Sequence, residues 1–264
     1  MKKIILHLSI FIYPLLFISC TTVPGIGRTQ FAPIPSGQML NMSTKEYGKV
    51  LKSSKLSKDK KSTQMVKRVG KRIAKAVDDL LKEEGVEMKF DWEFNLIEDD
   101  KMANAWCMPG GKIAVYTGIL KYTKDETGLA VVMGHEVAHA VAKHGNERMT
   151  QGIGLSLATV ALAISLNDQD PTTRNLFLSA FGAGAQVGIM LPFSRYQETE
   201  ADRLGLQLMA RAGYDPIASI DFWKRMAKSG GPKPPEFLST HPSHENRIEK
   251  LMEFIPEASI YYFP

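Results

Sequence analysis

The sequence predicts an α+β fold that is mostly helical, with one small antiparallel sheet, in a single domain of residues 38–264. Three observations support this prediction. Apolar residues recur at helical spacing in several long segments, one aromatic segment alternates with a period of two, and a Pro-Gly-Gly turn precedes a β-branched run. With 44% hydrophobic and 23% charged residues among its 264, the chain can bury a large core.

The amino-terminal residues 1–19 are typical of a bacterial lipoprotein signal peptide. Lys2 and Lys3 precede an apolar run that is shorter than the roughly 20 residues needed to cross a bilayer. The run ends in "FISC", which resembles a lipobox, although Phe17 stands where Leu is usual. Cys20 is therefore the predicted lipidation site, and an unlipidated secreted protein is the alternative.

The segment of residues 20–37 is rich in Pro, Gly and Thr, so we expect a lipid-anchored tether between a membrane and the folded domain. Thr21 is not an Asp-type retention signal, which favours the outer membrane over the inner one. The protein is then expected on the periplasmic side of a bacterial membrane. Its formal net charge is only +5 and its charges are interspersed, so no nucleic-acid partner is predicted.

The first folded elements are predicted from the periodicity of the chain. Residues 59–84 show helical spacing with a charged outer face, and Gly85 ends this helix. Residues 90–96 alternate aromatic and polar side chains, which predicts a half-buried strand. Residues 113–117 predict a second strand, paired with the first as in a hairpin. A helix over residues 123–145 follows.

This helix is predicted to begin with a capping box, formed by Thr123 and Glu126, and to end near Gly145. Residues 152–193 are apolar and rich in small residues, and we expect two closely packed buried helices there, or a flap over a cleft. A membrane hairpin is the alternative, which is disfavoured because each apolar run is short and interrupted. The remaining elements are three helices, at residues 195–212, 216–228 and 243–255.

The sequence "HEVAH" suggests a metal site. His135 and His139 are four residues apart, so a helix places both imidazoles on one face, with Glu136 beside them. With this HExxH spacing two neutral imidazoles can bind one Zn²⁺ while the glutamate addresses a water on the metal. A pair of histidines without a metal is the alternative. His144 is expected to face away from the pair, at the end of the helix.

A hydrolytic zinc site needs three protein ligands and one open position, so a third ligand is expected. Glu198 and Asp202 are four residues apart and share one face of a later helix, whereas Glu200 points elsewhere. The spacing does not choose between the first two carboxylates. A charged first turn, stabilised by the helix dipole, is the alternative without a metal.

Four motifs in order resemble those of a known family. They are "NAWCMPGG" before a strand, "HEVAH", "ETEAD" as ExxxD, and "HPSHENRI" as HPxxxxRI. Residues 40–255 thereby resemble the HtpX/CAAX-prenyl-endopeptidase family of zinc metallopeptidases, metallopeptidase family forty-eight, and are similar to its short periplasmic lipoproteins and to Oma-type proteases. The resemblance implies a zincin (gluzincin) fold, with the small sheet packed on the HExxH helix.

The resemblance also implies a role for each residue of the site. His135, His139 and Glu198 would be the ligands of one Zn²⁺ per chain. Glu136 would be the general base that takes a proton from the zinc-bound water. Asp202 would hydrogen-bond a ligand imidazole and hold its tautomer.

Five further residues are implied in substrate binding or catalysis. Asn104 and the strand of residues 112–117, with Ile113 and Val115, would form an edge to which an extended peptide adds as a strand. His241 is either a donor to the developing oxyanion or a latch that fills the open zinc position; an ordinary loop histidine is the alternative. Arg247 would pair with a carboxylate near the site or cap its helix.

The predicted function is therefore that of a zinc-dependent metalloendopeptidase, a hydrolase that cleaves unfolded or damaged envelope proteins. Its expected partners are unfolded or extended polypeptides and, through the lipid on Cys20, a membrane. The alternative is a zinc-stabilised periplasmic chaperone or assembly factor with little or latent proteolysis. Glu136 argues against that alternative, because a purely structural zinc site has no need of a base.

Overall fold

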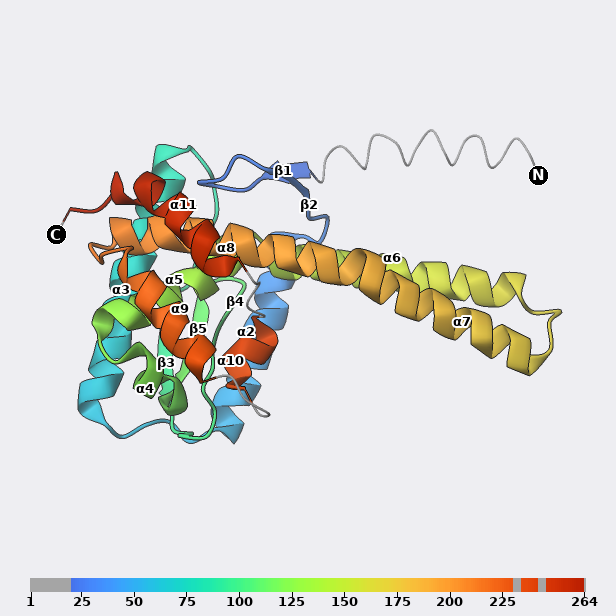
Figure 1. Ribbon diagram of the computed structural model, residues 1–264, viewed down its shortest axis with the longest axis horizontal. Coiled ribbons are helices and arrows are strands. Elements are labelled where there is room, and N and C mark those ends of the chain that lie inside the picture. Colours follow the sequence, from blue (N-terminus) through green and yellow to red (C-terminus); the bar gives the residue numbers. More distant parts are fainter. Residues whose placement is uncertain (1–19, 230–233, 242–245, 264) are drawn as a thin grey trace.

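The computed structural model describes residues 20–229, 234–241 and 246–263, in one body from which a long pair of helices projects (Figure 1). The expected signal peptide of residues 1–19 lies outside the described residues. In chain order the elements are β1 (Cys20–Thr22), β2 (Thr29–Phe31), α2 (Ser36–Ser53), α3 (Lys60–Glu83), β3 (Glu93–Ile97), β4 (Ala105–Met108), β5 (Lys112–Tyr116), η1 (Thr117–Ile119), α4 (Leu120–Thr123), α5 (Glu126–Val141), α6 (His144–Ser165), α7 (Pro171–Ala185), the π-helical turn η2 (Gln186–Met190), α8 (Leu191–Arg211), α9 (Ala218–Lys228), α10 (Glu236–Thr240) and α11 (Arg247–Ser259).

The body is layered around a small sheet. Helices α3 and α5 bury their apolar residues against one face of the sheet, and α2 covers the other face with Tyr47. Helix α3 starts at the cap Asp59, whose carboxylate accepts from the backbone N–H of Lys61, and Gly85 follows it with a φ of 64°. The predicted helix of residues 59–84 and its glycine stop are therefore confirmed.

The sheet has the strand order β3-β5-β4, so β5 is its central strand. β4 and β5 form an antiparallel hairpin, closed by Gly110 and Gly111, which both have a φ of 85°. β3 pairs with β5 in parallel. The expected antiparallel pairing of residues 90–96 with 113–117 is therefore wrong, because an additional strand, β4, precedes the turn and takes the antiparallel place.

Helix α5 is the central element of the body and contacts α3, α8, α9 and β4. Its cap is Asp125, which accepts from the backbone N–H of Gly128 at 2.8 Å. The expected capping box of Thr123 and Glu126 is wrong, because the Thr123 hydroxyl instead donates to the carbonyl of Leu120 and closes α4. The apolar residues of α5 are buried on all sides, which makes it a core helix.

The segment of residues 20–37, which was expected to be a tether, is folded onto the body. β1 pairs with β2, and Val23 is fully buried. Arg28 donates from Nη1 to Glu147 at 2.8 Å and from Nε to Glu200 at 2.5 Å. Both carboxylates are buried on helices of the body, and their attraction for the guanidinium holds this segment in place.

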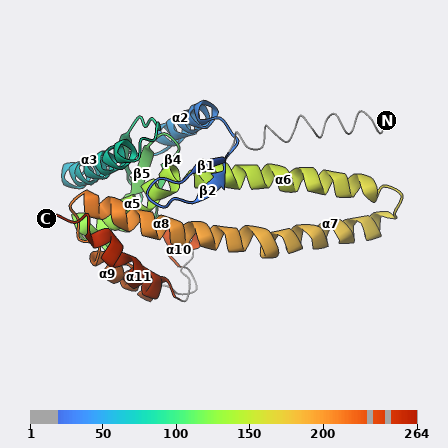
Figure 2. The same ribbon diagram turned by 90° about the horizontal axis from the view of Figure 1, so that it is seen from above.

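The helices α6 and α7 leave the body together and run side by side (Figures 1 and 2). The expected buried helices at residues 152–193 are wrong, since every residue from Gln151 to Gly184 is exposed or half-buried. Figure 2 shows the two helices apart over most of their length and joined at the tip, so in the part of the chain that the structure describes their apolar side chains have little protein over them. The helical segment Pro171–Arg211 is long and apolar enough to cross a membrane.

Candidate metal centre

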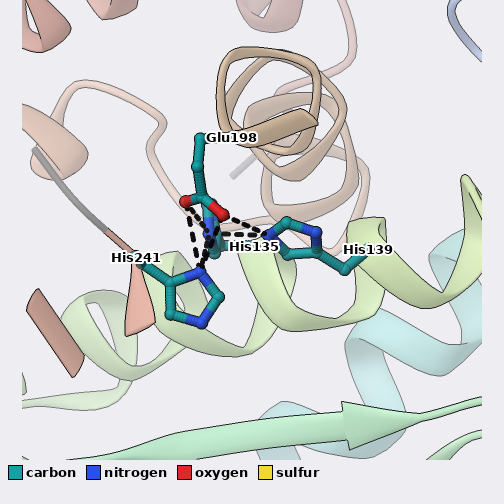
Figure 3. Close-up of side chains that lie close together, drawn as sticks. All are labelled: His135, His139, Glu198 and His241. Carbon is teal, nitrogen blue, oxygen red and sulfur yellow. Dashed lines mark hydrogen bonds and ion pairs between the residues drawn. The ribbon is translucent and has the colours of Figure 1, made fainter. Parts of the chain in front are cut away.

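Three side chains with metal-binding atoms converge between α5 and α8, and a fourth approaches from the loop after α10 (Figure 3). The Nε2 atoms of His135 and His139 lie 3.1 Å apart. The carboxylate oxygens of Glu198 lie 3.3 Å from each of these nitrogens. His241 completes a group whose potential ligand atoms all lie within 4.8 Å of one another.

The spacing of these atoms fits a metal ion. Zinc binds nitrogen and oxygen ligands at about 2.0–2.2 Å, so its ligand atoms in a tetrahedron lie roughly 3.3–3.5 Å apart. The observed separations of 3.1 and 3.3 Å are close to this value. His135 directs Nδ1 at a carboxylate, which leaves the lone pair of Nε2 pointing at His139. Two facing imidazoles and a carboxylate can therefore hold a cation between them.

The two helices approach closely because each has a glycine at the crossing. A Cβ atom built on Gly134, next to His135, would lie 2.9 Å from the carbonyl oxygen of Gly205. A Cβ atom on Gly205 would lie 3.0 Å from the backbone nitrogen of His135. This close backbone approach brings Glu198 of α8 within reach of the histidines of α5.

A buried ion pair supports the first histidine. Asp202 lies 3.0 Å from Nδ1 of His135 and accepts from Nη2 of Arg247 at 2.7 Å. The guanidinium of Arg247 is stacked on Trp223, 3.3 Å from the ring centroid. The structure thus places Asp202 and Arg247 behind the site, where the motif resemblance implies them, with Arg247 pairing the carboxylate.

Burial and the neighbouring charges shift the pKa values of the site residues in different directions. Burial opposes the protonation of His135, but the hydrogen bonds that its ring donates to the carboxylates of Asp202 and Glu198 outweigh this effect and raise its pKa to about 9. Burial lowers the pKa of His139 well below its usual value. For Glu198, burial favours the neutral acid, yet its hydrogen bonds with three histidines lower its pKa. The carboxylate is therefore charged, and a metal held by these residues at neutral pH would take the place of the proton on His135.

Glu136 and His241 face each other across the site. Oε1 of Glu136 lies 3.2 Å from Nε2 of His241, and burial raises the pKa of this carboxyl. The Nδ1 atom of His241 lies 3.1 Å from Nε2 of His135 and 3.1 Å from the carboxylate of Glu198. His241 is thus placed both beside the ligand atoms and beside the expected base.

One member of the cluster was missed by sequence reasoning. His144 is fully buried, and its Nδ1 lies 2.8 Å from Nδ1 of His139. The expectation that it faces away assumed one continuous helix, in which residues five apart point in different directions. The helix instead ends before Lys143, which has a φ of 52°, and a new helix, α6, begins at His144. Glu200, expected to point elsewhere, lies 3.6 Å from Nε2 of His144.

The expected substrate edge needs a correction. Ile113 and Val115 belong to the central strand β5, are almost fully buried and have a strand on each side. No peptide can pair with that strand. Asn104 precedes β4 and accepts from the backbone N–H of Tyr116 through its carbonyl. β4 is the edge strand on this side of the sheet.

A cavity of about 460 Å³ opens beside this edge strand. Cys107 and Met108 of β4 line it, as do Leu40 of α2, Phe90 and His139. Burial raises the pKa of the Cys107 thiol, so it stays neutral. The cavity therefore offers a mostly apolar space that reaches a member of the candidate metal centre.

The fold and this ligand set together define a zincin-type metallopeptidase fold, mostly helical with a small sheet against the HExxH helix. A family model described as Peptidase family M48 matches residues 63–255, and the chain belongs to this family.

Named relatives agree with this assignment. Mitochondrial metalloendopeptidase OMA1 of Schizosaccharomyces pombe is 42% identical over 173 residues, covering 64% of this chain and 48% of that protein. Metalloendopeptidase OMA1, mitochondrial, of Homo sapiens is 36% identical over 179 residues, covering 64% and 33%. Beta-barrel assembly-enhancing protease of Escherichia coli (strain K12) is 28% identical over 235 residues, covering 87% and 46%. The chain thus spans about half or less of the length of these relatives.

Proposed function

We propose that the protein is a zinc metalloendopeptidase that cleaves unfolded or damaged proteins of the bacterial envelope. The observation that carries this proposal is the convergence of His135, His139 and Glu198 from two helices, with Glu136 beside them. Membership of Peptidase family M48 and the printed names of the relatives support it.

Each residue of the site has a role in this proposal. His135, His139 and Glu198 hold one zinc ion, which when bound lowers the pKa of water and polarises a peptide carbonyl. Glu136 is the general base, and its raised pKa suits a group that accepts a proton and returns it to the leaving amine. Asp202 holds the ring of His135 through Nδ1, so that Nε2 is directed at the metal.

The substrate would bind along β4. In an antiparallel pair the main-chain groups of alternate residues point toward the neighbouring strand and away from it. Because Asn104 bonds to β5 through its carbonyl, Ala105 and Cys107 direct theirs to the free edge, where the N–H of Ala105 donates to Oδ1 of Asn104 at 2.8 Å. An extended peptide can pair there, and the apolar cavity beside Cys107 can take one of its side chains. Main-chain pairing favours unfolded substrates over a particular sequence.

The first test compares the wild type with Glu136→Gln, measuring zinc content and the cleavage of an unfolded protein such as casein. Both proteins should bind one zinc, and the variant should cleave at least about 100-fold more slowly, because it has lost the general base. Glu126→Gln is the matched control, since Glu126 lies on the same helix but pairs with Arg68 away from the site. Equal cleavage by wild type and Glu136→Gln would rule out the assigned base.

A second candidate function is a zinc-stabilised chaperone or a latent protease, in which His241 closes the open position. The distance of 3.1 Å from Nδ1 of His241 to the carboxylate of Glu198 favours this reading. The variant His241→Ala separates the alternatives. A faster cleavage of casein identifies a latch, whereas a slower cleavage with unchanged zinc content identifies a donor to the oxyanion.

The proposed location is the periplasmic side of the outer membrane, with a lipid on Cys20. Cys20 is exposed and opens β1. The relatives named as beta-barrel assembly-enhancing proteases are bacterial, while the OMA1 relatives are named as mitochondrial. The lipobox-like "FISC" is therefore the feature that favours this location.

A further inference from the structure

The projecting helices expose an apolar surface of unusual extent. Helices α6 and α7 and the turn η2 carry many of the large exposed apolar side chains of the described chain, and polar residues do not cover them. In the Pro171–Arg211 segment almost none of the most apolar stretch is buried. The exposed members are Met149, Ile153, Leu157, Val160, Ile164, Leu176, Phe177, Val187 and Ile189, and Leu191 at the start of α8 continues this surface.

The ionisable residues of this hairpin are confined to its two ends. The ascending arm has none from residue 149 to residue 167, and the descending arm has none from residue 175 to residue 194. These runs of 19 and 20 residues are about 29 and 30 Å long at 1.5 Å per residue. The hydrocarbon core of a bilayer is about 30 Å thick.

Both ends carry the groups expected at a membrane surface. At the base, Arg148 and Arg195 flank the apolar runs, and Tyr196 is half exposed beside them. At the tip, Asp168 and Asp170 are followed by a helix that starts at Pro171. Arginine and tyrosine favour the boundary between lipid and water. The hairpin therefore has a polar base, an uncharged apolar belt formed by residues 149–167 and 175–194, and a polar tip.

Three hydroxyl groups within the ascending arm of the belt are already satisfied by the helix backbone. Ser156 donates to the carbonyl of Gly152, and Thr159 donates to that of Leu155, each at 2.8 Å. Ser165 donates to the carbonyl of Leu162 at 2.8 Å. Because these hydroxyl groups are already hydrogen-bonded, their transfer into lipid, which offers no hydrogen-bond partners, costs little free energy.

We propose that the hairpin of α6, α7 and η2 spans a phospholipid bilayer, with the tip at residues 168–174 emerging on the far side. A second copy of the chain is a poorer occupant. Leu176 and Phe177 are adjacent on α7 and point about 100° apart, yet both are exposed, so a partner on one side would leave apolar surface in water. A bilayer covers every side of both helices, and its thickness matches the uncharged length.

This placement brings the candidate metal centre to the membrane surface. Arg195 ends the uncharged run of the descending arm, and Glu198 follows three residues later on the same helix α8. Three residues correspond to about 4.5 Å along the helix axis. The site would therefore meet polypeptides at the lipid surface.

The test measures depth in the bilayer and does not depend on catalysis. The full chain is reconstituted in vesicles that contain lipids brominated either deep in the acyl chain or near the headgroup. Val160→Trp places a fluorophore in the middle of the belt, and Ile217→Trp is the control on an exposed position of the body. The wild type supplies the background of its own three tryptophans.

We expect deep bromines to quench most of the fluorescence added by Val160→Trp and to leave that of Ile217→Trp unchanged. Equal quenching of the two variants would overturn the proposal. Quenching of Val160→Trp by shallow bromines alone would show a hairpin lying on the surface, which also contradicts it. Loss of quenching together with dimers in cross-linking would assign the apolar surface to a second copy.

Discussion

At the scale of single residues, Asp202 connects the candidate metal centre to the rest of the core. Its carboxylate contacts both Nδ1 of His135 and the guanidinium of Arg247, and burial would favour its neutral form. The charge of Arg247 outweighs that effect and lowers the pKa of Asp202. A charged acceptor therefore lies at Nδ1 of His135.

We predict that Asp202→Asn lowers the affinity for zinc by about 10- to 100-fold, because the neutral amide holds His135 less firmly. Competition with a chromogenic chelator measures this affinity. Asp215→Asn, whose carboxylate caps the turn before α9, serves as the control with an unchanged zinc affinity. An unchanged affinity in Asp202→Asn would exclude a role in positioning the ligand.

The residues of the centre were only partly predictable from the sequence. Helical spacing places His135 and His139 on one face of a helix, and the structure has them there. Spacing alone did not choose between Glu198 and Asp202, since both share the face of α8 that meets α5. His144 was missed because its position follows from the left-handed backbone of Lys143, which no residue pattern indicates.

At the scale of elements, the crossing of α5 and α8 depends on two glycines. A methyl group on Gly134 would lie 2.9 Å from the backbone of Gly205, and backbone cannot rotate away as a side chain can. The helices must then separate, which moves Glu198 away from the histidines.

We predict that Gly134→Ala destabilises the protein by about 1–3 kcal/mol through overpacking and also weakens zinc binding. Gly48→Ala is the matched control, because a methyl group there meets open space on helix α2 and should be neutral or stabilising by up to about 1 kcal/mol. Thermal unfolding with and without zinc measures both effects. Equal melting temperatures for the two variants would contradict the close-packing argument.

Some elements were predictable and others were not, for physical reasons. The period of 3.6 in α3 and the glycine after it predicted that helix to within a residue. β4 escaped prediction because four residues, with Trp106 and Cys107 adjacent, are too few to show an alternation. The helices of residues 152–193 were expected to be buried, since an apolar run looks the same in a core and in lipid.

At the scale of the whole molecule, the amino-terminal segment is part of the fold. Arg28 neutralises two buried carboxylates, Glu147 on α6 and Glu200 on α8, and its own side chain is only 17% exposed. These two helices continue into opposite arms of the hairpin. The guanidinium therefore ties the two arms together at their base.

We predict that Arg28→Ala costs about 3 kcal/mol in the free energy of unfolding, because two buried carboxylates lose the arginine charge that neutralises them. Arg68→Ala, which removes an exposed pair with Glu126, should cost less than about 1 kcal/mol. Urea unfolding compares the variants. Adding Glu147→Gln and Glu200→Gln to Arg28→Ala should restore part of the loss; equal losses for the two arginine variants would refute the buried pairing.

In the sequence, the hairpin lies between the two histidines and the glutamate of the candidate metal centre. His135 and His139 precede it and Glu198 follows it, so a single cut between residues 166 and 170 would yield two polypeptides with incomplete sets. Their only covalent link would be gone. A bound ion would then join two separate chains, and its removal by a chelator would leave the packing of α3 and α5 on α8, and the ion pair of Arg28 with Glu200, to keep the halves together.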